Sequence, residues 1–263
     1  MNTKKLRIPL DILMTLVSMI LMGGAYLFPA DIVHEILGVA LFVLWAVHIA
    51  LNRRWYGVLF RGQYNARRVL QTVINCGILG CVIFLMISGI ILSNHIFAFL
   101  GIESGLGFAR TAHLLASHWY YMFMSLHIGM HVEMIISKCH SRAPTREAVQ
   151  EEIVSQSSPS FAKQNLRSSP AMFTKQTRST VTNKSGSPMT WICRSIFILI
   201  SLYGIYAFII RGIWRYLVLQ QQFFFLDLER GYVLFALDYI SIIILFAITI
   251  HYLNKLLQKG KVS

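Results

Sequence analysis

Histidine is the residue type that could carry chemistry in this sequence. The chain contains nine histidines, and most of them lie within or at the ends of long apolar segments. Ionisable side chains are costly inside apolar helices, so a regularly spaced set favours a functional role. His34 and His48 are fourteen residues apart. His113 and His127 repeat that spacing.

Fourteen helical residues return a side chain to nearly the same face of its helix. At about 100° per residue the rotation is about 1400°, some 40° short of four full turns, and the rise is about 21 Å. Each pair therefore places one imidazole near each side of a bilayer. One helix separates the two histidine-bearing helices along the chain, so these two run in the same direction. Their histidines are then expected at matched depths.

Two imidazoles at one depth are suited to be the axial ligands of a b-type haem. The spacing predicts two stacked haems, the outer one held by His34 and His113. The inner haem would be held by His48 and His127. Neutral imidazole suits iron, and a cofactor can lie between the helices of an apolar bundle.

Two further histidines of the segment that carries His113 and His127 leave alternatives open. His131 lies four residues after His127 and approximately shares its face, so these two could hold a small divalent metal instead. His118 and His131 are thirteen residues apart and form a rival pair. His127 is preferred as a ligand because it repeats the fourteen-residue step from His113. His131 could instead bond a haem propionate or stand near a quinone.

Six apolar segments must position these histidines. Hydrophobic residues make up 56% of the chain and charged residues 13%, which excludes global disorder and is unusual for a soluble globule. A membrane-crossing helix needs about 20 mainly apolar residues, and lipid requires its backbone to be bonded internally. Each segment is therefore expected to be a membrane-spanning helix. The expected spans are 8–28, 32–51, 70–93, 111–137, 191–210 and 232–253.

These segments predict an all-α, polytopic transmembrane bundle with three parts. Residues 1–138 are expected to form a four-helix membrane core with the haem sites, and residues 191–263 a two-helix membrane hairpin. Between them, residues 139–190 are rich in Ser, Thr, Gln, Lys and Arg and contain four prolines. No apolar periodicity runs through this stretch, so a disordered, basic cytoplasmic linker is expected there.

The distribution of basic residues predicts the orientation. The formal net charge is +13, and Lys and Arg concentrate at the N-terminus, in the loop 52–69, in the stretch 138–190 and at the C-terminus. Basic loops stay on the cytoplasmic side, so both termini are expected there, in the inner cell membrane. The loop 211–231 is an exception, with three arginines. Bases at the ends of apolar segments indicate membrane lipid rather than nucleic acid as their partner.

Several segments resemble those of one family of prokaryotic membrane proteins. The strongest are His34-Glu35-Ile36-Leu37-Gly38, His48 with Leu51-Asn52-Arg53-Arg54-Trp55, and Ser125-Leu126-His127-Ile128-Gly129-Met130-His131. Further similar segments are 88–90, 203–208, 223–227 and 238–239, together with His113. The chain is similar here to an uncharacterised, cytochrome-b-like integral-membrane domain family, over nearly its whole length except the stretch 139–190.

The resemblance implies transmembrane electron transfer by haem. The recurrent histidines of the family fall on His34, His48, His113, His127 and His131. His118 stands outside that set. Members look like partners of extracytoplasmic flavin-bearing redox proteins, in the manner of ferric-reductase-like cytochromes.

The leading interpretation is a membrane electron carrier. Electrons would enter at the cytoplasmic haem from a quinol or a cytoplasmic reductant, and leave to an extracytoplasmic flavoprotein or another acceptor. No dinucleotide-binding glycine fingerprint follows a strand, so the chain is expected to be a subunit of a membrane oxidoreductase. A His-lined transporter of metal ions or protons is the alternative, although no inverted repeat or broken helix supports it. A membrane scaffold without cofactor is a third interpretation.

Overall fold

The structure is a computed structural model, and its described part is helical. It describes the backbone of residues 3–23, 30–59, 61, 64–140, 188–221 and 231–259. Helices are the regular elements throughout these ranges, which confirms the all-α class expected from the sequence. Most of the expected linker at 139–190 lies outside the described residues.

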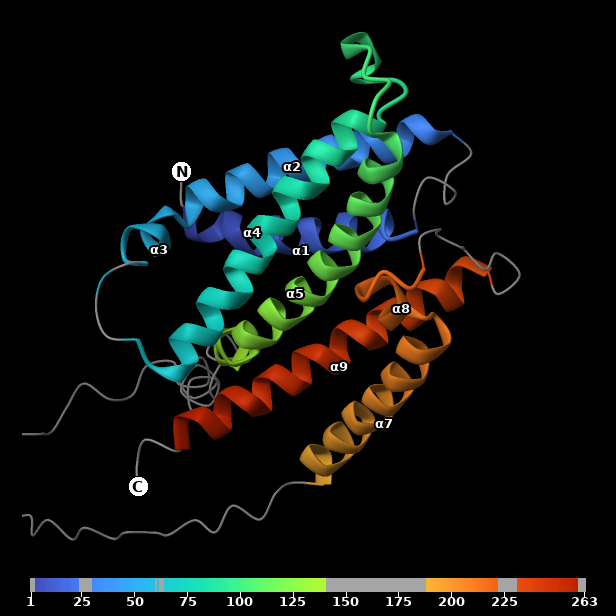
Figure 1. The fold of residues 1–263 in the computed structure, drawn as a ribbon. Coiled ribbons are helices and arrows are strands. Elements are labelled where there is room, and N and C mark those ends of the chain that lie inside the picture. The colour runs from blue at the N-terminus through green and yellow to red at the C-terminus, as the bar shows by residue number, and fades with distance from the viewer. Residues whose placement is uncertain are drawn as a thin grey trace, which may run out of the picture. The chain divides into compact units, whose positions relative to one another are not determined.

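A long helix occupies each of the six expected ranges (Figure 1). Two short helices, α3 and α8, and one 3-10 turn were not expected from the sequence. In chain order the elements are α1 (Thr3–Leu21), α2 (Asp31–Leu51), α3 (Arg53–Gly57), α4 (Ala66–Leu92), the turn η2 (Ala98–Leu100), α5 (Leu106–His140), α7 (Pro188–Ile210), α8 (Ile213–Leu217) and α9 (Gly231–Lys259).

The first helix ends earlier than the sequence predicted. The apolar span was expected to continue to Phe28, whereas α1 ends at Leu21 and the next two residues form a turn. Glycines occupy positions 23 and 24, and glycine favours helix termination because it adopts the conformations that follow a last helical turn. Residues 24–29 lie outside the described part of the chain.

Three of the described helices are long and apolar enough to cross a membrane. They are α2, α4 and the Gly231–Leu257 part of α9. The described part of α7 provides a shorter apolar stretch, Ser195–Ile210. The 35-residue helix α5 includes five histidines and is less apolar overall. The chain thus has multi-pass helical character, while membrane crossing by α1, α5 and α7 stays a prediction.

The chain divides into two compact units. One comprises Met1–Val132 and Ile196–Ser263, and the other comprises Glu133–Ser195. The first unit holds most of every long helix, so the last two long helices belong to the same unit as the first four. Of the second unit, the structure describes the end of α5 and the start of α7.

Glycines allow α9 to approach its neighbours very closely. A Cβ atom built on Gly129 of α5 would lie 2.3 Å from the carbonyl oxygen of Ala247 in α9. A Cβ atom on Gly204 of α7 would lie 2.6 Å from the carbonyl oxygen of Ser241, also in α9. Both distances are too short for real atoms, so the α9 backbone rests directly on these glycines. Small residues permit such contacts between apolar helices.

Buried polar contacts fix the same helix. The carboxylate of Asp238 in α9 lies 2.7 Å from Nε of Arg211 and accepts a 2.5 Å hydrogen bond from the Tyr203 hydroxyl. The Tyr121 hydroxyl of α5 donates to the carbonyl oxygen of Tyr239 at 2.5 Å. A charge taken out of water needs such partners, because removing one would leave the other charge uncompensated.

Replacing Gly129 with alanine should therefore destabilise the bundle. The added methyl group meets backbone atoms of α9 that cannot move aside, and overpacking of this kind costs about 1–3 kcal/mol. Gly80→Ala is the matched control, because a Cβ atom at Gly80 would meet nothing within 4 Å. Alanine favours a helix over glycine, so the control should be unchanged or slightly more stable. Denaturation followed by circular dichroism in detergent measures both, and equal stability of the two variants would contradict the close contact.

Candidate functional site

The structure brings the first expected histidine pair together. His34 lies in the first turn of α2 and His113 lies in α5, and their ring centroids are 6.3 Å apart with the planes at 60°. An imidazole nitrogen binds a metal at about 2 Å and the ring centroid lies about 1 Å beyond it, so two imidazoles on opposite sides of one metal have centroids about 6 Å apart. The observed spacing therefore fits two axial ligands of one iron.

Ser88 of α4 sets the tautomer of His113. The Ser88 hydroxyl donates to the carbonyl oxygen of Phe84 at 2.6 Å. Toward Nδ1 of His113, 3.0 Å away, its oxygen is then the acceptor. Nδ1 therefore carries the ring proton, and Nε2 keeps the lone pair that a metal needs.

Gly89, the next residue of α4, leaves space beside the same ring. A Cβ atom there would lie 3.8 Å from Cε1 of His113, which is ordinary van der Waals contact. Any longer side chain would extend into the space next to the imidazole.

Glu35 anchors the helical turn that carries His34. Its carboxylate accepts hydrogen bonds from one side chain and three backbone N–H groups, all located just after α4. The donors are Oγ of Ser93 at 2.6 Å and the backbone nitrogens of Asn94 at 2.8 Å, His95 at 3.3 Å and Ile96 at 2.9 Å. These bonds tie the start of α2 to the end of α4, so the position of His34 is fixed relative to α4.

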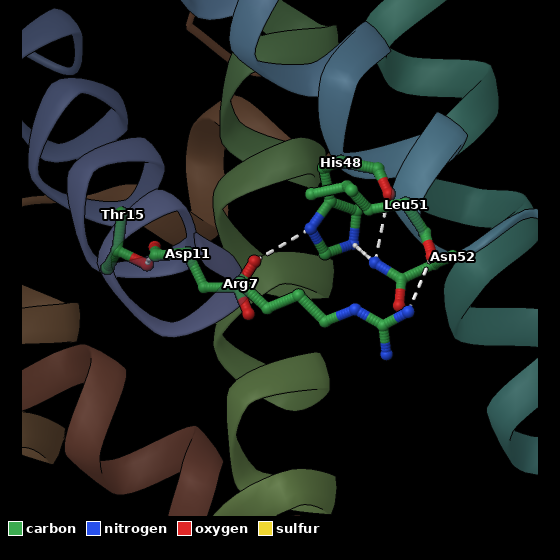
Figure 2. Close-up of polar contacts among 6 residues, drawn as sticks. All are labelled: Arg7, Asp11, Thr15, His48, Leu51 and Asn52. Carbon is green, nitrogen blue, oxygen red and sulfur yellow. Dashed lines mark hydrogen bonds and ion pairs between the residues drawn. The ribbon is translucent and has the colours of Figure 1, made fainter. Parts of the chain in front are cut away.

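A carboxylate from α1 holds His48, the first member of the second expected pair. Nδ1 of His48 lies 2.7 Å from Oδ1 of Asp11, and Figure 2 shows the carboxylate directed at the ring. An ionised carboxyl group only accepts, so Nδ1 is the donor and Nε2 carries the lone pair. The side-chain amide of Asn52 lies 3.4 Å from Nε2, at the long end of hydrogen-bond distances.

Arg7 adds a second contact between α1 and the end of α2. Its guanidinium donates to the carbonyl oxygen of Leu51 at 2.7 Å (Figure 2). Asp11 and Arg7 lie one helical turn apart on α1, so one face of this helix fixes both the ring of His48 and the last turn of α2.

The second member of that pair, His127, is held by α4. Its Nδ1 lies 2.9 Å from Oδ1 of Asn75. An amide oxygen accepts, so Nδ1 is again the donor. The ring centroid of His131 lies 4.7 Å from that of His127, with the planes at 59°. This distance is shorter than the roughly 6 Å expected for imidazoles on opposite sides of one metal.

His48 lies near His127, and the ring contact seen between His34 and His113 is not found between these two described residues. His48, Asp11 and His131 all lie close enough to His127 for electrostatic interaction, so the four side chains share one region. The rings of His48 and His127 make no contact like the one in the first pair. The first pair therefore has the ring spacing of two ligands of one metal, whereas the structure shows only that the second pair lies in one region.

His118 occupies a different environment. Its ring is 1% exposed and stacks on Tyr216 of α8 at a centroid distance of 4.2 Å. Its Nδ1 lies 2.8 Å from the carbonyl oxygen of Leu114 in its own helix. His118 therefore contributes to packing between α5 and α8. Among the residues whose side chains are described, no group of three or more His, Cys, Asp or Glu could hold a metal ion.

Sequence reasoning did not identify the residues that hold the ring nitrogens. The spacing of the histidines does not predict that Ser88, Asn75 and Asp11 would be their partners. In the structure the Asp11 side chain is 51% exposed. The available signal was the presence of single polar residues within an otherwise apolar helix, which indicates that each needs a partner.

Replacing Glu35 with glutamine should loosen the segment after α4. Glutamine keeps one acceptor oxygen where the carboxylate has two, so at least one backbone N–H is left without its bond, at about 1–3 kcal/mol. Amide hydrogen exchange at residues 94–96, followed by mass spectrometry, should accelerate. Glu103→Gln removes the same charge from an exposed loop and should leave exchange at 94–96 unchanged. Equal protection in both variants would contradict the anchoring role.

Comparison with known proteins identifies no relative of the chain. No protein-family model, curated protein or solved structure matches the chain.

Proposed function

We propose that the chain is a multi-pass membrane electron carrier that binds b-type haem between α2 and α5. The single observation that carries the proposal is the 6.3 Å separation of the His34 and His113 rings, which suits opposed ligation of one iron. The outer haem would be held by these two residues. The inner haem would be held by His48 and His127, with His131 beside it.

The hydrogen bonds of the histidines support metal ligation. Ligating histidines usually give their second ring N–H to a nearby acceptor, which fixes the ring and raises its basicity. His113, His48 and His127 each have Nδ1 within hydrogen-bond distance of an acceptor on another helix. Each therefore has its lone pair on Nε2, where a metal could bind; at His48 the metal would take the place of the Asn52 amide, which lies 3.4 Å from this nitrogen. Bound haem supplies reversible one-electron chemistry of its iron.

The proposed location is the inner cell membrane. Three of the described helices are long and apolar enough to cross a bilayer, and the basic segments favour a cytoplasmic side for both termini. The electron donor would be a quinol or a cytoplasmic reductant, and the acceptor an extracytoplasmic flavoprotein or another redox partner. The chain would then act as the electron-transfer subunit of a membrane oxidoreductase.

A His-lined metal-ion or proton transporter is the second candidate. The 4.7 Å approach of the His127 and His131 rings favours it, because two imidazoles on one face of a helix can bind a divalent cation. The opposed rings of His34 and His113 favour haem instead. Cofactor content separates the two proposals directly.

Protein purified in mild detergent should show a b-type reduced-minus-oxidised spectrum with about two haems per chain. His113→Ala and His34→Ala should each remove one haem, because iron would lose an axial ligand. His95→Ala is the control, since this histidine is exposed and its side chain lies outside the pair. Colourless protein that binds zinc or copper would support the transporter, and full haem content in both variants would contradict the assignment.

The choice between His127 and His131 is tested in the same way. Since the side chain of Asn75 orients the ring of His127, His127→Ala should remove the inner haem. His131→Ala should keep both haems. If His131→Ala abolishes the inner haem while His127→Ala does not, His131 is the ligand.

A further inference from the structure

The acceptors that hold the three histidine rings differ in charge. His48 is bonded to the carboxylate of Asp11 at 2.7 Å. His127 is bonded to the amide oxygen of Asn75 at 2.9 Å, and His113 to the hydroxyl of Ser88 at 3.0 Å. Of these three rings, only that of His48 is therefore held by a formally charged acceptor.

The charge of Asp11 is directed at His48. Within the described residues, the carboxylate of Asp11 pairs with His48, while Arg7 of the same helix donates to the carbonyl oxygen of Leu51. Asp11 is 51% exposed and His48 26% exposed, so screening weakens the field of the carboxylate at a distance. The hydrogen bond from Nδ1 to the carboxylate changes the basicity of the imidazole itself, so solvent screening between Asp11 and the iron does not remove this effect.

A carboxylate on the far nitrogen makes an imidazole a more basic ligand than a neutral acceptor does. A more basic axial ligand favours the more positive, ferric form of the iron, which lowers the reduction potential. Hydroxyl and amide acceptors have a smaller effect because they carry no net charge.

Resting on the proposed function, we propose that Asp11 makes the haem at His48 and His127 the lower-potential one of the two. One electron passing from that haem to the haem at His34 and His113 would then move energetically downhill, oxidising the first and reducing the second. Asp11 would act as a positioning and tuning residue, since it acts on the iron through His48.

Redox titration of the haem-loaded protein, followed by optical spectroscopy, tests this proposal. Asp11→Asn keeps the size of the side chain and removes its charge. It should raise the midpoint potential of the lower-potential component by about 59 mV or more, which is a tenfold change in the equilibrium constant for one-electron reduction. The higher-potential component should stay unchanged. Glu103→Gln, which removes a charge from an exposed loop, should shift neither.

Assignment of the two components provides a second, independent test. His113→Ala should remove the higher-potential component and leave the lower one. Loss of the lower component instead would overturn the proposed order, even if Asp11→Asn failed to load haem. With two haems bound, an unchanged lower component in Asp11→Asn would also overturn the proposal. A protein without haem would instead overturn the function on which this proposal rests.

Discussion

The hydrogen bonds that hold the rings of His48, His113 and His127 connect the candidate site to the packing of the bundle. In an apolar interior an unpaired donor is costly, and no bulk water can replace a missing partner. Side chains from other helices bond these three rings: α4 provides Ser88 and Asn75, and α1 provides Asp11. Each bond fixes a tautomer, and each also fixes the position of one helix against another.

Helix packing and the candidate site depend on each other for this reason. The carboxylate of Glu35 ties α2 to the end of α4, one residue after His34 in the chain. Gly129 lies in α5 between His127 and His131, and it allows α9 to rest against the same helix. A displacement of α9 would therefore be transmitted to the helical turns that carry both histidines.

The sequence predicted the helices well, but it did not predict which side chains contact the histidines. The second span was expected at 32–51 and α2 is Asp31–Leu51, because apolar length and helix-ending residues are local signals. The fourteen-residue spacing also anticipated that His34 and His113 would meet. Periodicity could not show that Asp11 would reach His48, because that contact depends on how α1 packs against α2. It likewise could not show that the ring of His127 would lie 4.7 Å from that of His131.

Electron paramagnetic resonance of the oxidised, purified protein tests the central claim most directly, because the ferric signal reports the axial ligands of the iron. Ligation of one iron by His34 and His113 predicts a low-spin signal typical of two imidazole ligands. His113→Ala should convert to high spin, or remove, the share of this signal that belongs to that haem, while the share of the haem at His48 and His127 stays. A haem signal that is high-spin in the unmodified protein, or one that His113→Ala leaves unaltered, would contradict it.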